Sequence, residues 1–275
     1  MTQDKTRGAG LFPALLKYWR GQRGVSQLDL ALTAGISARH VSFMETGRAK
    51  PSEDMVFTVC EALDVPLRAR NALLQAAGFE IAYAEPSIDE VLSGPIGEAV
   101  ERMMAHHEPF PMIAMDRHYN MLRANAGALR LISRFLPNPE RLGPRPNVVE
   151  ILFDPEMVRP FVADWQKMGR ALMTRLHRDA LRRPDDDEVR ALIERLLAFP
   201  DVPESFRHPD FGQPSGAAFN LRFRRDDVEM AFLTTVTRFA APQNITLEEL
   251  QIESYFPLDD ETRAICQQGW GAEMT

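Results

Sequence analysis

Cysteine is scarce in this chain: Cys60 and Cys266 are the only two among 275 residues. A disulfide framework requires more cysteines than this, and two cysteines do not form a zinc site unaided. The six histidines include no pair with the H-x-x-x-H spacing of a helical metal site. We therefore expect neither a disulfide-stabilised fold nor a metal centre.

Long apolar runs are absent as well. No stretch approaches the roughly 18 consecutive apolar residues that a membrane-spanning helix requires. The opening string MTQDKTRGAGLF lacks the continuous apolar core of a secretion signal. Both absences predict a cytoplasmic protein with no membrane partner.

The composition and the charge distribution indicate two different folded domains. Hydrophobic residues make up 45% of the chain and charged residues 26%, as in soluble globular proteins, and the length suggests two domains of ~100–200 residues each. Residues 1–80 carry 10 basic against 8 acidic residues, whereas the remainder has a net charge of −9 within the total of −7. Within residues 17–50 the count is six basic against two acidic, which favours a nucleic-acid contact.

Residues 11–77 predict an all-α domain of five short helices, at 11–22, 27–34, 38–45, 52–63 and 67–77. Ser26 is well placed to cap the second helix, with Asp29 three residues further on. Gly35 can adopt the left-handed conformation that ends a helix, and Ser37 caps the next one. Two short helices joined by such a tight turn form a helix-turn-helix, whose second helix can enter the DNA major groove.

The exposed side of residues 38–45 carries side chains suited to reading DNA. Arg39 can form a bidentate bond to guanine, and Ser42 can bond a base or a phosphate. Ala38 and Phe43 can contact thymine methyl groups. Neighbouring residues are suited to phosphate contacts. The predicted DNA-contacting set comprises Gln27, Ser37, Ala38, Arg39, Ser42, Phe43, Arg48 and Lys50.

The string VSQLDLALTAGISARHVSFMETGRAKPS resembles the Cro/cI-type (XRE) helix-turn-helix. This resemblance implies double-stranded operator DNA as the partner. DNA affinity would further require a homodimer whose recognition helices lie about 34 Å apart, so that they meet successive faces of the major groove. The positions that carry the resemblance are Ser26, Gln27, Leu30, Ala31, Gly35, Ile36, Ser37, Val41, Ser42, Glu45, Gly47 and Pro51.

The rest of the chain predicts an α+β domain at 88–275, joined to residues 1–80 by a linker at 81–87. Strand-like segments lie at 112–116, 119–124, 217–223, 228–237 and 250–256, with a turn at 224–227. Helical segments end near 107, span 126–135 and 189–199, and include a long region around 161–176. This order predicts a five-stranded antiparallel sheet covered by helices.

Large apolar side chains between these layers would form either a pocket or a solid core, and the residues alone leave both open. The strings HEPFPMIAMDRHYNMLRANAGAL and TRFAAPQNITLEELQIESYFPLDDETRAI resemble the start and end of the ligand-binding domain of MmyB-like transcription regulators. The resemblance implies a PAS-like fold with a buried pocket for a small lipophilic effector of the fatty-acid class. A carboxylate ligand needs a polar anchor; Arg123 is the first candidate, followed by His118 and Asn125. The predicted ligand-binding set comprises Met112, Met121, Arg123, Asn125, Trp165, Met168, Phe219 and Phe232.

Three charged features have more than one interpretation. Arg20 either pairs with Glu45 or contacts a phosphate. Glu253, at the centre of a predicted strand, is expected to pair with an arginine such as Arg222. The acidic run at 185–188 is interpreted as the start of a helix, where the helix dipole stabilises carboxylates, rather than as a metal site.

Two further functions remain open at this point. An antitoxin-like or partner-binding adaptor would use the second domain, with a solid core, to dock a protein. An enzyme would draw on residues at 106–118, but no nucleophile–base pattern or glycine-rich phosphate loop supports one. We therefore expect no catalytic residue and no cofactor; the side chains considered for catalysis are His106, His107, Glu108, Asp116 and His118.

Overall fold

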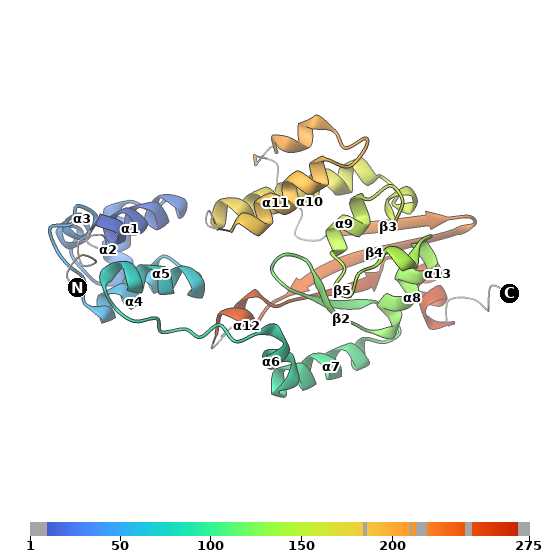
Figure 1. Ribbon diagram of the computed structural model, residues 1–275, viewed down its shortest axis with the longest axis horizontal. Coiled ribbons are helices and arrows are strands. Elements are labelled where there is room, and N and C mark those ends of the chain that lie inside the picture. The colour runs from blue at the N-terminus through green and yellow to red at the C-terminus, as the bar shows by residue number, and fades with distance from the viewer. Residues whose placement is uncertain (1–9, 184–185, 210, 213–218, 240–243, 269–275) are drawn as a thin grey trace. The chain divides into compact units, whose positions relative to one another are not determined.

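The computed structural model describes residues 10–183, 186–209, 211–212, 219–239 and 244–268. The described chain forms two compact units (Figure 1). The first contains residues up to 88 together with 244–248, and the second contains residues 89–239 together with the chain from 249 onward. None of the described helices is long and apolar enough to cross a membrane.

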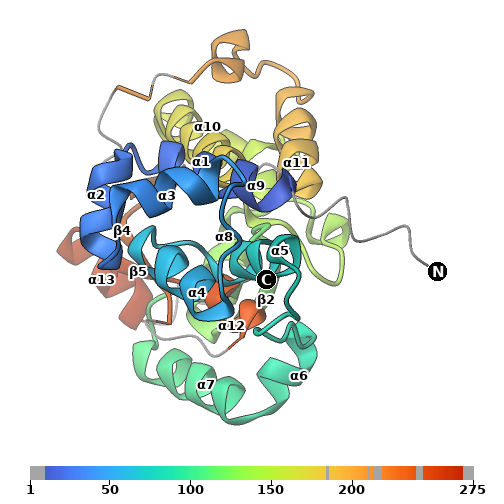
Figure 2. The same ribbon diagram turned by 90° about the vertical axis from the view of Figure 1, so that its left-hand side faces the viewer.

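The first unit is helical, as the sequence predicts (Figure 2). A single apolar core holds its helices together, and Leu16, Val41, Met44 and Val56 are completely buried in it. The five helices are α1 (Leu11–Gln22), α2 (Gln27–Ala34), α3 (Ala38–Glu45), α4 (Glu53–Ala62) and α5 (Leu67–Ala77).

The local signals that fix α2 and α3 form as expected. The Ser26 hydroxyl accepts a hydrogen bond from the Asp29 amide, and the Asp29 carboxylate accepts one from the Ser26 amide in return. Gly35 follows α2 with φ of 66°, a left-handed conformation that favours glycine. Ser37 then caps α3 by accepting from the His40 amide. The turn between the two helices is therefore determined by residues close together in the sequence.

The N-terminus of α5 is capped from a distant part of the chain. Its preceding residue, Pro66, offers no side-chain cap. The Leu67 amide instead donates to both carboxylate oxygens of Glu248, at 2.9 and 3.2 Å. Glu248 lies in α12 (Ile245–Glu249), where Thr246 also donates to the Pro86 carbonyl. A carboxylate at a helix N-terminus satisfies an unpaired amide and interacts favourably with the helix dipole.

The second unit is built on a five-stranded antiparallel sheet, which confirms the expected fold class. The order across the sheet is β2-β1-β5-β4-β3, so that β5, the last strand in the sequence, lies in the middle. The β3–β4 turn is shorter than expected: the strands extend to Arg225 and from Val228, and Asp226 has φ of 55°. The strands are β1 (Met112–Met115), β2 (Met121–Ala124), β3 (Phe219–Arg225), β4 (Val228–Thr237) and β5 (Gln251–Pro257).

Helices cover both sides of this sheet (Figure 1). α9, α10 and α11 lie on one side and α7 on the other. The helices of the unit are α6 (Ile88–Ser93), α7 (Pro95–His107), α8 (Ala126–Phe135), α9 (Val148–Phe153), α10 (Trp165–Arg182), α11 (Asp187–Leu197) and α13 (Asp260–Gln267), with short 3-10 turns η2 (Pro139–Arg141), η3 (Arg159–Phe161) and η4 (Glu204–Arg207).

Because successive strand residues point to opposite faces, the pairing register decides which side chains meet which helices. Ile113 pairs with Glu253 across β1 and β5, and both face α8, α9 and α10. Met112 pairs with Ser254, and both lie on the opposite face. Apolar burial between the sheet and α8–α10 forms most of the core of this unit.

A close backbone approach positions α8 and yields a test of this packing. A Cβ atom at Gly127 would lie 2.5 Å from the Pro109 carbonyl oxygen and 2.9 Å from that of Phe110. Backbone atoms do not yield as a flexible side chain does, so G127A should destabilise the second unit by about 1–3 kcal/mol. Urea unfolding of the full chain measures this. G143A is the control, since nothing lies within 4 Å of a Cβ there; equal stability of the two variants would contradict the packing.

Candidate nucleic-acid interface and ligand cavity

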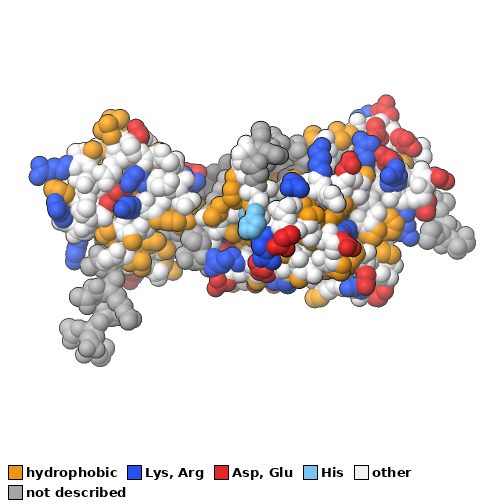
Figure 3. Space-filling view, turned by 90° about the horizontal axis from the view of Figure 1, so that it is seen from above, with side chains coloured by type: hydrophobic (Ala, Val, Ile, Leu, Met, Phe, Trp, Pro, Cys, Tyr) orange, Lys and Arg blue, Asp and Glu red, His pale blue; other side chains and the backbone are white. Residues whose placement is uncertain are grey.

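α3 presents one face to the core of the first unit and the other to solvent. Val41 and Met44 are fully buried, whereas Arg39 is exposed and Ser42 is partly exposed. Figure 3 shows basic side chains grouped at the end of this unit where Figure 1 places α3. The helix therefore has an outward face available to a partner.

Two arginines gather around one aromatic ring on this face. The Arg39 Cζ atom lies 5.1 Å from the centre of the Phe43 ring, and the Arg48 Cζ atom lies 6.0 Å from it. Such cation–π contacts restrict the long arginine side chains while leaving their N–H groups free to bind. Lys50 and Ser37 are also exposed, and Ala38 is partly so. Arg39, Phe43 and Arg48 thus lie together on the outward side of α3 and the segment after it.

Gln27 and Arg20 are engaged elsewhere. The Glu45 carboxylate accepts from Arg20 Nε at 2.6 Å and from Gln27 Nε2 at 2.7 Å. Burial alone would raise the pKa of Glu45, but the hydrogen bonds from Arg20 and Gln27 hold it below its ordinary value. Of the two roles open to Arg20, the structure shows the ion pair. These two hydrogen bonds connect α1 and α2 to the end of α3, and they fix the orientation of α3 relative to both helices.

The second unit contains a partly open cavity of about 70 Å³ between the sheet and α8, α9 and α10. Its wall is mostly apolar, with 15 aliphatic, methionine or phenylalanine residues among the 19 that line it. Four polar residues complete the wall: Tyr119, Arg175, Glu253 and Tyr255. The interior is therefore a pocket rather than a solid core, and it is apolar with one polar region.

Met121 and Met168 are the members of the predicted ligand set that line this cavity. Met112 precedes Ile113 on β1, and adjacent strand residues point to opposite faces, so Met112 lies on the face of the sheet away from the cavity. Phe232 is fully buried in the adjoining core. Trp165 lies behind the wall, where its Nε1 donates to the Leu152 carbonyl at 2.8 Å.

The predicted polar anchors lie away from the cavity. Arg123 points to solvent and pairs with Glu101 at 3.1 Å. Asn125 is buried as the cap of α8, where its Oδ1 accepts from the Met112 and Ala128 amides. Its side-chain polar groups are thus engaged with the backbone. The side chain of Phe219 falls outside the described part of the structure.

Two protein-family models match this chain, one in its N-terminal part and one in its C-terminal part. A helix-turn-helix family model matches residues 16–69, and a model of the MmyB-like transcription regulator ligand binding domain matches residues 96–268. The chain belongs to the MmyB-like transcription regulators. It therefore combines a DNA-binding domain with a ligand-sensing domain. No curated protein was found as a relative of the chain.

None of the four polar residues that line the cavity of the MmyB-like domain was among the predicted ligand-binding residues. Arg175 follows Met168 and Leu172 at helical spacing, so extending that face of α10 by one position would have found it. Its Nη2 donates to Gln251 Oε1 at 2.9 Å, and its Cζ lies 5.2 Å from the Tyr119 ring. Glu253 does not pair with Arg222, which lies on the other face and bonds Glu229 at 2.6 Å.

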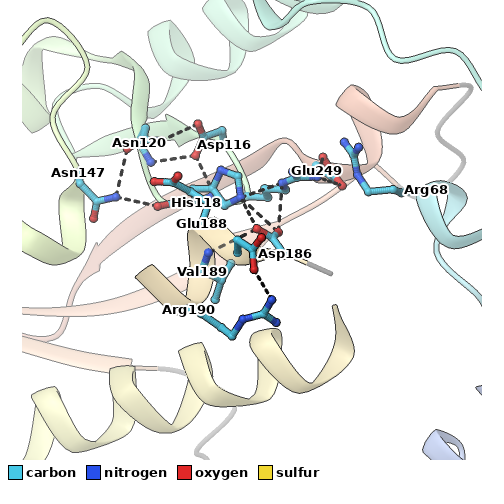
Figure 4. Close-up of polar contacts among 12 residues, drawn as sticks. Arg68, Asp116, His118, Asn120, Asn147, Asp186, Glu188, Val189, Arg190 and Glu249 are labelled. Atoms are coloured by element: carbon cyan, nitrogen blue, oxygen red, sulfur yellow. Dashed lines mark hydrogen bonds and ion pairs between the residues drawn. The ribbon is translucent and has the colours of Figure 1, made fainter. Parts of the chain in front are cut away.

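His118 belongs to a separate polar cluster in the same domain (Figure 4). Its Nε2 lies 3.0 Å from Asp186 Oδ1 and also 3.0 Å from Arg117 Nε, so the imidazole and the guanidinium lie side by side against this carboxylate. Arg117 lies 3.4 Å from Asp186 and 2.9 Å from Glu249. Asp186 also caps α11 by accepting from the Val189 amide, as the dipole argument for the acidic run expects. The cluster joins the β1–β2 turn to α11.

This cluster predicts a pH dependence of stability. Burial would raise the pKa of Asp186, but the hydrogen bond and charge of His118, together with Arg117, lower it to about 2 from 3.8. A folded-state pKa below the unfolded value stabilises the fold above about pH 4, and this contribution is lost as pH falls through 2. D186N should cost about 1–2 kcal/mol at pH 7, after allowance for solvent screening, and almost nothing near pH 2.

Urea unfolding of the full chain at pH 7, 4 and 2 measures this difference. D187N is the matched control, because the neighbouring Asp187 side chain is 93% exposed. A D186N variant whose stability falls with pH as steeply as that of the unsubstituted chain would contradict the role of the cluster.

Proposed function

We propose that this regulator binds operator DNA as a homodimer through α3, and that the cavity of its MmyB-like domain binds a small lipophilic effector of the fatty-acid class. The observation that carries the proposal is the cavity itself, with its 15 apolar lining residues. Transfer of an apolar chain from water into such a cavity is favourable, whereas a domain that only docks a protein does not require an internal cavity. We place the protein in the cytoplasm, together with the DNA that it would bind.

In the DNA complex, α3 lies in the major groove. Arg39 bonds guanine through its bidentate fork, and Phe43 offers a ring edge to a thymine methyl group. Arg48 and Lys50 neutralise phosphates beside the groove. Gln27 contributes through the backbone amides at the start of α2, since its side chain is bonded to Glu45. A dimer presents two such helices to half-sites about 34 Å apart.

The short segment from Glu248 to Glu253 supports a route from the effector to the DNA-binding unit. Glu248 caps α5 in the first unit, and Glu253 lines the cavity in the second, five positions later in the sequence. An effector that shifts or holds β5 therefore acts on a strand that begins at Gln251, three residues after Glu248. The effector changes DNA affinity only to the extent that it binds two arrangements of the chain with different affinity.

The DNA contact is tested with sequences selected from random duplexes by the full-length protein. R39A should lower affinity for the selected DNA about 10- to 100-fold, because one bidentate base contact is worth ~1–3 kcal/mol. R48A should reduce the slope of log affinity against log salt by about 0.9. R222A, which removes an exposed arginine of the second unit, is the control. Unchanged binding by R39A would rule out this reading of α3.

The cavity is tested by filling it. I132W places a large ring into the lining from α8, whereas L129W adds the same ring to an exposed position of the same helix. Small molecules that co-purify with each variant are extracted and identified by mass spectrometry. We expect an acyl compound with the unsubstituted chain and L129W, and little with I132W.

Overpacking can unfold a domain, so a milder filling, L172F, and the melting temperature of each variant accompany the comparison. Equal acyl content in folded I132W and L129W would contradict binding in this cavity.

A further inference from the structure

The sheet side of the cavity carries a carboxyl group in a position where an apolar side chain would pack well. Glu253 lies on β5, the central strand, paired with Ile113 of β1 and Val236 of β4. Its side chain lines the cavity and is partly buried. A carboxylate placed among apolar groups is destabilising unless something solvates or pairs it.

The surroundings of Glu253 compensate this carboxyl only weakly. The Tyr255 hydroxyl lies 3.5 Å from it, which is a long hydrogen bond, and Thr234 supplies another. Among the described residues no Lys, Arg or His nitrogen comes within 4.0 Å of this carboxylate. Burial accordingly raises the pKa of Glu253, and the charge of Arg175 and the hydrogen bonds from Thr234 and Tyr255 offset this only in part.

Arg175 lines the same cavity from α10 but does not reach Glu253. One nitrogen of its guanidinium donates to Gln251, and its carbon centre lies over the Tyr119 ring. An arginine has five N–H donors, so this bond leaves others for a further acceptor. The Tyr119 hydroxyl donates to Asp179 at 2.9 Å and is thereby engaged. The polar region of the cavity therefore offers donors from Arg175 and a carboxyl from Glu253.

We propose, resting on the proposed function, that the cavity selects an effector with a neutral head group that both accepts and donates hydrogen bonds. Arg175 donates to its carbonyl oxygen, and Glu253 accepts from its N–H or O–H. A long-chain primary amide fits this description, and so does a fatty acid in its undissociated form. A fatty-acid anion does not, because it would place a second carboxylate beside Glu253 without a proton to share.

The groups around this site predict how binding depends on pH. Arg175 and Asp179 come from α10, Tyr119 from the β1–β2 turn and Tyr255 from β5, while Arg238, after β4, bonds Gln251 at 3.3 Å. α8 and α9 contribute only apolar residues to the lining. A fatty acid should bind more weakly as rising pH removes the shared proton, whereas an amide has no such proton to lose.

The experiment compares three ligands of one chain length on the delipidated full-length protein: dodecanoic acid, dodecanamide and methyl dodecanoate. Affinities are measured by calorimetry at pH 6 and pH 8. At pH 8 the amide should bind about 10- to 100-fold more tightly than the dodecanoate anion or the ester, the effect of one hydrogen bond to a charged group. The acid should approach the amide at pH 6.

Two variants separate the roles of the polar residues. E253Q, whose amide can donate to an anion, should bind dodecanoate equally at pH 6 and pH 8. R175M should weaken all three ligands, since each presents a carbonyl oxygen. E229Q changes a glutamate on the other face of the sheet and should leave all affinities unchanged.

The outcomes distinguish head-group selection from the more general proposal that the cavity binds a lipophilic effector. If no acyl ligand binds at either pH, the proposed function fails. If all three bind alike, or the anion binds at pH 8 as tightly as the amide, the lipophilic cavity stands and the head-group selection is wrong. The ligand and pH series on the unsubstituted chain decides this even where a variant does not fold.

Discussion

The ligand-binding domain depends on the pairing of β5. In the described sheet the β1–β2 pair is not adjacent to the β3–β4 pair, and β5 joins them by pairing with β1 on one side and β4 on the other. Because β5 follows both pairs in the sequence, the sheet becomes continuous only when this late segment inserts. Non-local pairing costs chain entropy, which the apolar burial beneath α8–α10 must offset. Without β5 the cavity would lose the part of its wall that Glu253 and Tyr255 form.

The two-residue period of the strands explains why the secondary structure was predictable and the cavity lining was not. Alternation and turn signals located all five strands and their approximate bounds. Assigning a face requires the register as well, and a shift of one residue exchanges the faces. Met112 and Ile113 illustrate this: the prediction chose Met112, but it is Ile113 that lines the cavity. Glu253 was identified in the sequence but assigned the wrong partner, Arg222, since its actual surroundings come from α10, β4 and the β1–β2 turn.

Short-range and long-range interactions differ in the same way within the helix-turn-helix. Ser26, Asp29 and Gly35 act within a few residues of their own positions, so the sequence predicted α2, the turn and α3 correctly. Gln27 engages Glu45, 18 residues away, and competition between this bond and a phosphate cannot be judged from spacing. The same limit applies to Arg20, whose two roles were separated only by the observed ion pair.

The carboxyl group of Glu253 in the cavity wall lowers the stability of the fold, and such a cost points to a functional role. A carboxyl without a charged partner in an apolar wall is generally less stable than an apolar residue of similar shape. Natural proteins depart from such local consistency chiefly where a site has a function. Glu253 follows Glu248, the cap of α5, by only five residues. In the proposed complex, a head group bound by Glu253 would restrain the segment that follows Glu248, whose carboxylate caps α5 within the DNA-binding unit. The carboxyl of Glu253 would then act in regulation as well as in recognition.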